Sequence, residues 1–288
     1  MLIQYYLRKG MEVVVLSRKS QATNGNLRYV YWDGVNLDDW AKELENALAV
    51  VNLAGKSVDC RYNEKNKKEI YDSRLNSTAV LGKAILACEK PPKVWINAAS
   101  ATIYRHAEDR PMDEITGEIG TGFSVDVCEK WEAVFNQINT PRTRKVLMRL
   151  AMVFGKTGGV IVPFKNLVKL GLGGHQGKGT QYMSWLHEKD FAEIINWMIQ
   201  NDSATGIYNC SSPNPVPNKE FMSAFRAAFR QKIGIPAMEW MVKIGVFLMS
   251  TEAELILKSR RVIPTRLLKD GYHFQYEKID EALNDLAN

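Results

Sequence analysis

The sequence predicts an α/β protein: a Rossmann-like, doubly wound parallel sheet that lacks its first strand and glycine loop, with a smaller mixed C-terminal substrate lobe. Two observations predict this fold. Short runs that are apolar throughout, such as residues 13–16, are typical of strands buried on both faces of a parallel sheet. These runs alternate with stretches of helical periodicity, and strands and helices that alternate at this spacing indicate right-handed βαβ units.

The elements of the first half follow one another in a regular order. Gly10 suits the end of a short first helix, and the Pro91-Pro92 pair ends the longest helix. In order, we then predict strands at 13–16 and 28–31, a helix over 37–48, a strand at 49–53, a helix over 66–89, a strand at 94–96, a helix over 125–138 and a strand at 145–150.

Glycines become frequent after residue 155, and the regular alternation ends there. We predict helices over 189–200 and 218–229, a strand at 206–209, and short helices after 235 with Tyr272 and Phe274 in a further strand. This pattern divides the chain into a Rossmann-like dinucleotide-binding domain over 1–155, substrate-lobe segments over 156–234 and a short helical domain over 235–288. Segments such as 182–210 are expected to pack back onto the first domain.

Composition excludes several functional classes. The chain has 288 residues, 45% of them hydrophobic and 24% charged, which is enough for a large core. No apolar run reaches the roughly 18 residues that span a bilayer, and the N-terminus lacks a signal-peptide layout, so we expect a cytoplasmic protein without a membrane segment. The net charge of +6 is spread along the chain rather than clustered among aromatic residues, so we expect no nucleic-acid partner.

The cysteines and histidines show no metal-ligand spacing. The 4 cysteines are scattered, and the 4 histidines form no close pair. We therefore expect reduced, structural cysteines and no bound metal.

The order of elements places the first predicted strand second in a nucleotide-binding sheet. In such sheets the first strand-to-helix turn carries glycines that grip the pyrophosphate of the cofactor. A short helix comes first here, and no glycine motif precedes it. Either the sequence starts late, which we favour, or the protein has lost the glycine turn that binds the pyrophosphate. In both cases we expect dinucleotide binding to be weakened.

Five segments, in order, resemble one subgroup of atypical extended short-chain dehydrogenases/reductases: the nucleoside-diphosphate-sugar epimerases of the 39U type, which have a short C-terminal domain. The likeness spans nearly the whole chain. The segments are 52–55 (Asn-Leu-Ala-Gly), 73–78 with Ser73-Arg74 and Ser77-Thr78, 171–190 with Gly-Leu-Gly-Gly and Gln-Tyr-Met-Ser-Trp-Leu-His, 212–221 with Ser-Pro-Asn-Pro, and 261–283 with Arg-Val-Ile-Pro and Gly-Tyr-His-Phe.

The fold and the resemblance together indicate cofactor-binding residues. Ser17 and Arg18 end the second strand of the nucleotide-binding order, where the adenosine ribose is read, and a guanidinium there favours the 2′-phosphate of NADP over NAD. Alternatively, Arg18 belongs to a solvated basic turn. The resemblance implies further contacts with NADP by Leu53, Ala54, Gly55, Glu69, Arg74 and Val153. For Glu69, a surface ion pair is the alternative role.

Catalytic candidates follow the strand at 94–96. Ser100 is placed to donate a hydroxyl hydrogen bond to a substrate carbonyl, and Tyr104 either presents a phenol to substrate or packs in the core. Short-chain dehydrogenases use a tyrosine and a lysine four residues later, but Ser124 and Cys128 stand at those positions here. The subgroup shows the same departure.

The sequence and the resemblance lead to two functional hypotheses. The first is an NAD(P)-dependent oxidoreductase or epimerase of the epimerase/dehydratase type, acting on a small or nucleotide-sugar-like substrate. The second is a non-catalytic NADP-binding or regulatory protein, or an inactive homologue, because the tyrosine–lysine pair is absent. The natural substrate and the oligomeric state are left open.

Overall fold

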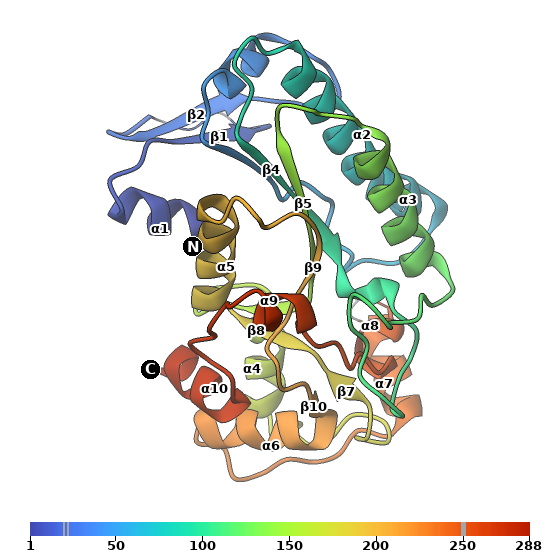
Figure 1. Ribbon diagram of the computed structural model, residues 1–288. Helices are drawn as coiled ribbons and strands as arrows, with labels where there is room; N and C mark the ends of the chain where they lie inside the picture. The colour runs from blue at the N-terminus through green and yellow to red at the C-terminus, as the bar shows by residue number, and fades with distance from the viewer. Residues whose placement is uncertain (20, 22, 249–251) are drawn as a thin grey trace.

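A parallel four-stranded sheet forms the centre of the molecule (Figure 1). The computed structural model describes residues 1–19, 21, 23–248 and 252–288. The strand order is β3-β4-β5-β9, and every pairing is parallel, as the sequence predicts. The strands are β3 (Ala49–Asn52), β4 (Val94–Ser100), β5 (Arg144–Leu150) and β9 (Gly206–Cys210).

A second parallel pair extends this layer. Strands β1 (Val13–Ser17) and β2 (Leu27–Tyr31) pair with each other in register. Val13 packs against the same apolar cluster as Val51, and Leu16 packs with Val50 against the cluster on the opposite face. One face of β1 and one face of β3 therefore pack against the first cluster, and their opposite faces pack against the second. Strands β1 and β3 thus lie in one layer. All five residues of β1 are half-buried, which corrects the expectation of full burial.

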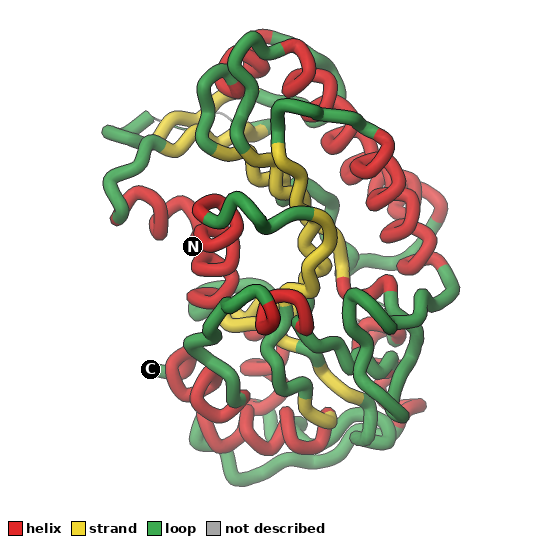
Figure 2. The backbone as a smooth tube through the Cα atoms, in the orientation of Figure 1, coloured by secondary structure: helices red, strands yellow, loops and turns green. Residues whose placement is uncertain are grey.

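Helices cover both faces of the sheet, and Figure 2 shows this layering. Helices α2 (Glu64–Ala87) and α3 (Phe123–Gln137) lie side by side on one face, where Leu81 and Phe135 are buried against Trp95 of β4. Helix α5 (Glu188–Gln200) covers the other face, next to α1 (Leu2–Arg8). This arrangement is the doubly wound order that the sequence predicts.

The C-terminal lobe forms around a separate apolar cluster. Strand β6 (Met152–Phe154) pairs with β8 (Trp185–His187), and β7 (Tyr182–Met183) pairs with β10 (Val216–Pro217). The cluster joins three helices, α4 (Ile161–Lys169), α6 (Asn218–Ala228) and α10 (Ile279–Ala287). The remaining elements are η1 (Asp39–Leu44), η2 (Ala101–Ile103), α7 (Glu239–Leu248), α8 (Glu254–Leu257) and α9 (Thr265–Lys269).

Two elements differ from the sequence prediction. The expected helix over 37–48 is the short 3₁₀ helix η1, because Glu45 is extended and Asn46 adopts a positive φ of 60° that ends the helix. Tyr272 and Phe274 form no strand. Their rings are instead buried in the cluster beneath the sheet, where they meet edge-on with centroids 4.9 Å apart.

Candidate functional site

A cavity of about 540 Å³ opens at the carboxyl ends of the central strands. This is where open α/β sheets bind their ligands. Of the residues proposed from the sequence, the cavity brings together six: Leu53, Ala54, Gly55, Arg74, Ser100 and Val153. Four others, Ser17, Arg18, Glu69 and Tyr104, are not among the residues that line it.

Buried amides fix the turn at the end of β3, which leads into the cavity lining. Asn52 lies opposite Asn97 in the ladder, and its Nδ2 donates to Asn97 Oδ1 at 2.7 Å. Asn52 Oδ1 in turn accepts a hydrogen bond from the backbone N–H of Ala54 at 3.0 Å. This turn leaves Leu53 45% exposed, as an apolar surface at the mouth of the cavity.

Gly55 and Arg74 form one wall of the cavity. A β-carbon at position 55 would lie 3.2 Å from Arg74 Cζ, so any larger residue would press on the guanidinium. Arg74 lies over the ring of Trp131 at 5.2 Å and donates to the carbonyl of Ile70 at 3.1 Å. Burial lowers its pKa. In the described part of the chain no carboxylate forms an ion pair with Arg74, so its charge can serve an anionic ligand.

Glu69 lies one turn before Arg74 on α2 and forms an ion pair with Lys56, which itself lines the cavity. The hydrogen bond from Lys56 lowers the pKa of Glu69. Lys56 Nζ also donates to Asn66 Oδ1 at 2.7 Å. The carboxylate of Glu69 therefore holds Lys56 at the rim.

Ser17 and Arg18 lie at the end of β1, beyond the cavity. The hydroxyl oxygen of Ser17 accepts a hydrogen bond from the backbone N–H of Lys19 at 3.1 Å, which closes a tight turn. Arg18 projects from this turn and is exposed. The turn sits at the same edge of the layer as Leu53, because both follow the carboxyl ends of strands.

Ser100 ends β4 and lines the cavity. Its hydroxyl oxygen accepts a hydrogen bond from the backbone N–H of Thr102 at 3.2 Å, so it caps η2. The serine proton is left available to a ligand in the cavity, because this bond uses only the oxygen.

Tyr104 is 1% exposed and is held in a buried polar network. Its hydroxyl donates to Asn209 Oδ1 at 2.9 Å and accepts from Arg149 at 2.8 Å. Arg149 also makes a two-pronged ion pair with Glu132, with both bonds 2.8 Å long. Both hydroxyl roles of Tyr104 are thus taken up inside the protein, and burial raises its pKa.

The start of α3 forms another part of the cavity wall. Phe123, Ser124, Val127 and Cys128 all line the cavity there. Burial raises the pKa of the Cys128 thiol to about 12, so this cysteine is neutral and is neither a nucleophile nor a proton acceptor. Ser124 donates to the carboxylate of Glu254.

The structure adds Tyr62 to the site, which the sequence did not indicate. Tyr62 lines the cavity, and its hydroxyl lies 3.5 Å from Ser124 Oγ. It precedes α2 by two residues, whereas Glu254 begins α8. No local motif could reveal these residues, because Tyr62 and Ser124 meet across 62 positions of the chain and Ser124 and Glu254 across 130.

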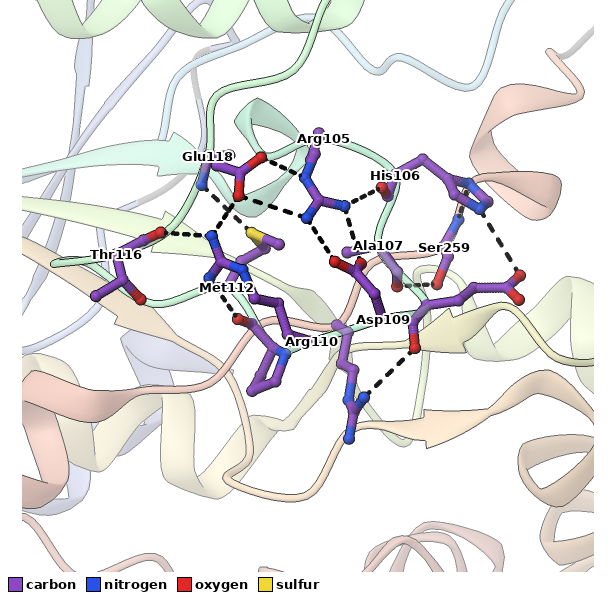
Figure 3. Close-up of polar contacts among 12 residues, drawn as sticks. Arg105, His106, Ala107, Asp109, Arg110, Met112, Thr116, Glu118 and Ser259 are labelled. Atoms are coloured by element: carbon purple, nitrogen blue, oxygen red, sulfur yellow. Dashed lines mark hydrogen bonds and ion pairs between the residues drawn. The ribbon is translucent and has the colours of Figure 1, made fainter.

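Figure 3 shows the loop that follows Tyr104. Arg105 bridges Asp109 and Glu118, with closest ion-pair distances of 2.8 and 2.7 Å, and Arg110 also pairs with Glu118. The backbone N–H of Ser259 donates to His106 Nδ1 at 3.1 Å. The ion pairs brace the loop itself, and the His106–Ser259 hydrogen bond joins it to the segment that follows α8.

The described residues offer neither a metal-binding cluster nor a membrane-spanning helix. No group of three or more histidine, cysteine, aspartate or glutamate side chains is placed to hold a metal ion there. Within the same residues, no helix combines the length and the apolar character needed to cross a membrane.

Comparison with known proteins gives two family matches. Residues 1–211 match the NAD dependent epimerase/dehydratase family, and residues 239–286 match a domain of unknown function (DUF1731). The chain is 30% identical to the epimerase family protein YfhF of Bacillus subtilis over 97% of this chain and 91% of the relative.

Solved structures agree with the fold. Human epimerase family protein SDR39U1 (isoform 2), crystallised with NADPH, superposes with a TM-score of 0.88 at 31% identity, over 99% of this chain and 94% of that chain. A nucleoside-diphosphate sugar epimerase from Corynebacterium glutamicum gives a TM-score of 0.75 at 26% identity, over 96% of this chain and 53% of that chain. The resemblance found in the motifs is confirmed: the chain belongs to the NAD dependent epimerase/dehydratase family.

Proposed function

We propose that the protein is an NADP-dependent oxidoreductase or epimerase that acts on a carbonyl or secondary alcohol of a small or nucleotide-sugar-like substrate. The observation that carries this proposal is the cavity of about 540 Å³ in which Ser100 meets the strand-end residues expected at the cofactor. The nicotinamide cofactor would supply or accept the hydride. The protein would orient it and polarise the reacting oxygen.

The residues that line the cavity fit parts of a dinucleotide, although the glycine turn for the pyrophosphate is not among them. Leu53 offers an exposed apolar surface, and the absence of a side chain at Gly55 leaves room beside Arg74. Arg74 provides a buried positive charge for an anionic part of the cofactor. Val153 and Leu150 line the opposite part of the cavity, where an apolar contact suits the nicotinamide ring. The human relative crystallised with NADPH supports NADP as the cofactor, and the name of the Corynebacterium relative supports a nucleotide sugar as the substrate class.

Ser100 would donate a hydrogen bond to the carbonyl oxygen of the substrate. A hydroxyl in that position strengthens its hydrogen bond as negative charge develops on the oxygen during hydride transfer. Tyr104 is assigned to structure in this proposal, because Arg149 and Asn209 occupy its hydroxyl.

A second function, binding NADP without catalysis, is favoured by Ser124 and Cys128 at the positions of the usual tyrosine and lysine. The two functions give different results in one experiment. NADPH is titrated by its fluorescence, and its oxidation is then followed with a panel of aldehydes, diketones and UDP-sugars. Binding with turnover that Ser100→Ala slows by about 100-fold supports the enzyme. Binding without any turnover supports the second function, and no NADPH binding contradicts both.

A further inference from the structure

Proton transfer in the proposed reaction needs an acid/base group. The usual tyrosine and lysine of short-chain dehydrogenases are absent from their positions and cannot supply it. Removal of a hydride from a secondary alcohol is accompanied by loss of the hydroxyl proton, which a base must take. Cys128 cannot do so, because its buried thiol is held neutral. Tyr62 is a phenol in the same cavity, and it comes from a different part of the chain.

Tyr62 is held firmly at the cavity wall. Its ring packs edge-on against Phe123, with centroids 4.7 Å apart. Its backbone N–H donates to a carboxylate oxygen of Glu252 at 2.8 Å. The loop before α2, the start of α3 and the segment before α8 therefore fix the phenol from three sides.

The hydrogen bonds around Ser124 have a direction. Ser124 has a single hydroxyl proton, and it donates that proton to the carboxylate of Glu254. In the 3.5 Å contact with Tyr62, Ser124 must then be the acceptor and Tyr62 the donor. The hydrogen bonds are thus donated from Tyr62 to Ser124 and from Ser124 to the carboxylate of Glu254. The phenol oxygen keeps its lone pairs for a ligand in the cavity.

We propose that Tyr62, Ser124 and Glu254 form the proton relay of this site, in place of the usual tyrosine and lysine. The inference rests on the proposed oxidoreductase function. In alcohol oxidation, the C–H bond breaks and its electron pair leaves as hydride to NADP⁺. The substrate hydroxyl proton passes to Tyr62, the Tyr62 proton to Ser124 and the Ser124 proton to the carboxylate of Glu254. Reduction of a carbonyl by NADPH reverses each transfer.

The surroundings of Glu254 suit this role. Lys258 and Arg260 follow it in the C-terminal segment, and both carry buried positive charge that acts on Glu254. Glu252 and Cys60 face the relay from the neighbouring loops, and Cys128 faces it from α3. Tyr62 is the catalytic residue here, and Glu254 acts on it through Ser124.

The first test uses neither cofactor nor substrate. If Glu254 withdraws the Ser124 proton, Ser124 Oγ should attack a fluorophosphonate probe: the Oγ–P bond forms, fluoride leaves and Glu254 takes the proton. Mass spectrometry should locate the label on Ser124, and Glu254→Gln should slow labelling at least about tenfold. Ser124→Thr, which keeps the hydroxyl, should retain labelling. Absence of label at Ser124, or equal labelling in Glu254→Gln, would overturn the relay.

The second test measures the hydride step. Tyr62→Phe, Ser124→Ala and Glu254→Gln should each slow NADPH oxidation about 100-fold with the carbonyl that the panel identifies, while the NADPH dissociation constant stays the same. Tyr31→Phe and Glu281→Gln are matched controls at exposed positions and should leave the rate unchanged. If the three relay variants retain the full rate, the relay is wrong although the proposed function stands. If NADPH does not bind, the proposed function itself fails, and the labelling result is unaffected.

Discussion

At the scale of single residues, we propose that Arg18 distinguishes the two dinucleotides. It follows β1, in the turn that Ser17 closes, and its guanidinium is exposed. A guanidinium binds a phosphate with two charge-assisted hydrogen bonds, whereas the 2′-hydroxyl of NAD offers no matching charge. Arg18 lies outside the cavity. This position suits contact with the adenosine end of the cofactor, because the ends of the strands are spread along the edge of the sheet.

We therefore expect Arg18→Glu to change cofactor preference. The NADPH dissociation constant should rise about 10- to 100-fold, because the substitution replaces attraction of the 2′-phosphate by repulsion. NADH binding should stay the same or improve, since a carboxylate accepts hydrogen bonds from the 2′-hydroxyl. Fluorescence titration of both cofactors checks this. Lys83→Glu, an exposed charge reversal on α2, is the matched control. Equal losses for NADPH and NADH would contradict the assignment of Arg18 to the 2′-phosphate.

At the scale of elements, apolar runs and helical periodicity predict most of the central sheet. The strands at 94–96 and 145–150 extend further in the structure, to Ser100 and from Arg144, because their polar ends still pair in the ladder. Tyr272 and Phe274 have the pattern of a strand, but they are drawn into the core by contacts with α5 that no local pattern encodes.

The residues of the candidate site also divide into those that the sequence reveals and those that depend on tertiary contacts. Ser100 was found from the sequence because it follows a strand, and Leu53–Gly55 because that strand-end segment resembles the one in the family; the ends of parallel strands gather at one edge of the sheet. Tyr62 and Glu254 lie in a loop and in a short helix, where position depends on tertiary contacts alone. Tyr104 was placed near the reacting groups by its spacing from Ser100, but the direction of its side chain is set by Arg149 and Asn209.

Helix α5 is connected to the C-terminal helix through a buried histidine. His187 caps α5 by accepting a hydrogen bond from the backbone N–H of Lys189 at 3.1 Å. Its ring stacks on Tyr276 with centroids 3.9 Å apart, and its Nε2 lies 3.4 Å from a carboxylate oxygen of Asp285. Burial lowers the pKa of His187 to about 4, and the nearby Asp285 offsets only part of this effect.

This pKa predicts a loss of stability in acid. Between about pH 6.5 and pH 4 the unfolded chain binds a proton at His187 that the folded protein does not, so the free energy of unfolding should fall as the pH falls through this range. The contribution is at most about 3 kcal/mol. His187→Asn keeps an acceptor for the cap and should flatten this part of the curve, measured by urea unfolding at a series of pH values. His273→Asn, at an exposed position, should leave the slope unchanged. A slope that persists in His187→Asn would assign the acid sensitivity to other groups.

At the scale of the whole molecule, one apolar cluster joins the two ends of the chain. Tyr6 of α1, Ile96 of β4 and Tyr272 of the C-terminal segment are buried in it together. Asp190 of α5 secures the C-terminal segment: its carboxylate accepts hydrogen bonds from the backbone N–H groups of Gln275 and Tyr276, at 2.7 and 2.9 Å. The C-terminal segment is therefore part of the core that supports the sheet, and through the sheet it supports the site.

We expect Asp190→Ala to destabilise the whole protein rather than the C-terminal segment alone. The substitution leaves two partly buried N–H groups without their acceptor and leaves the Tyr272 hydroxyl only the backbone carbonyl of residue 190, which should cost about 3 kcal/mol. Because Tyr272 and Ile96 share one cluster, hydrogen exchange should speed up about 100-fold in β4 as well as at residues 272–276. Asp59→Ala, an exposed aspartate, is the control. Faster exchange confined to 272–276 would mean that this segment opens independently, and that the sheet and the cavity keep their structure without it.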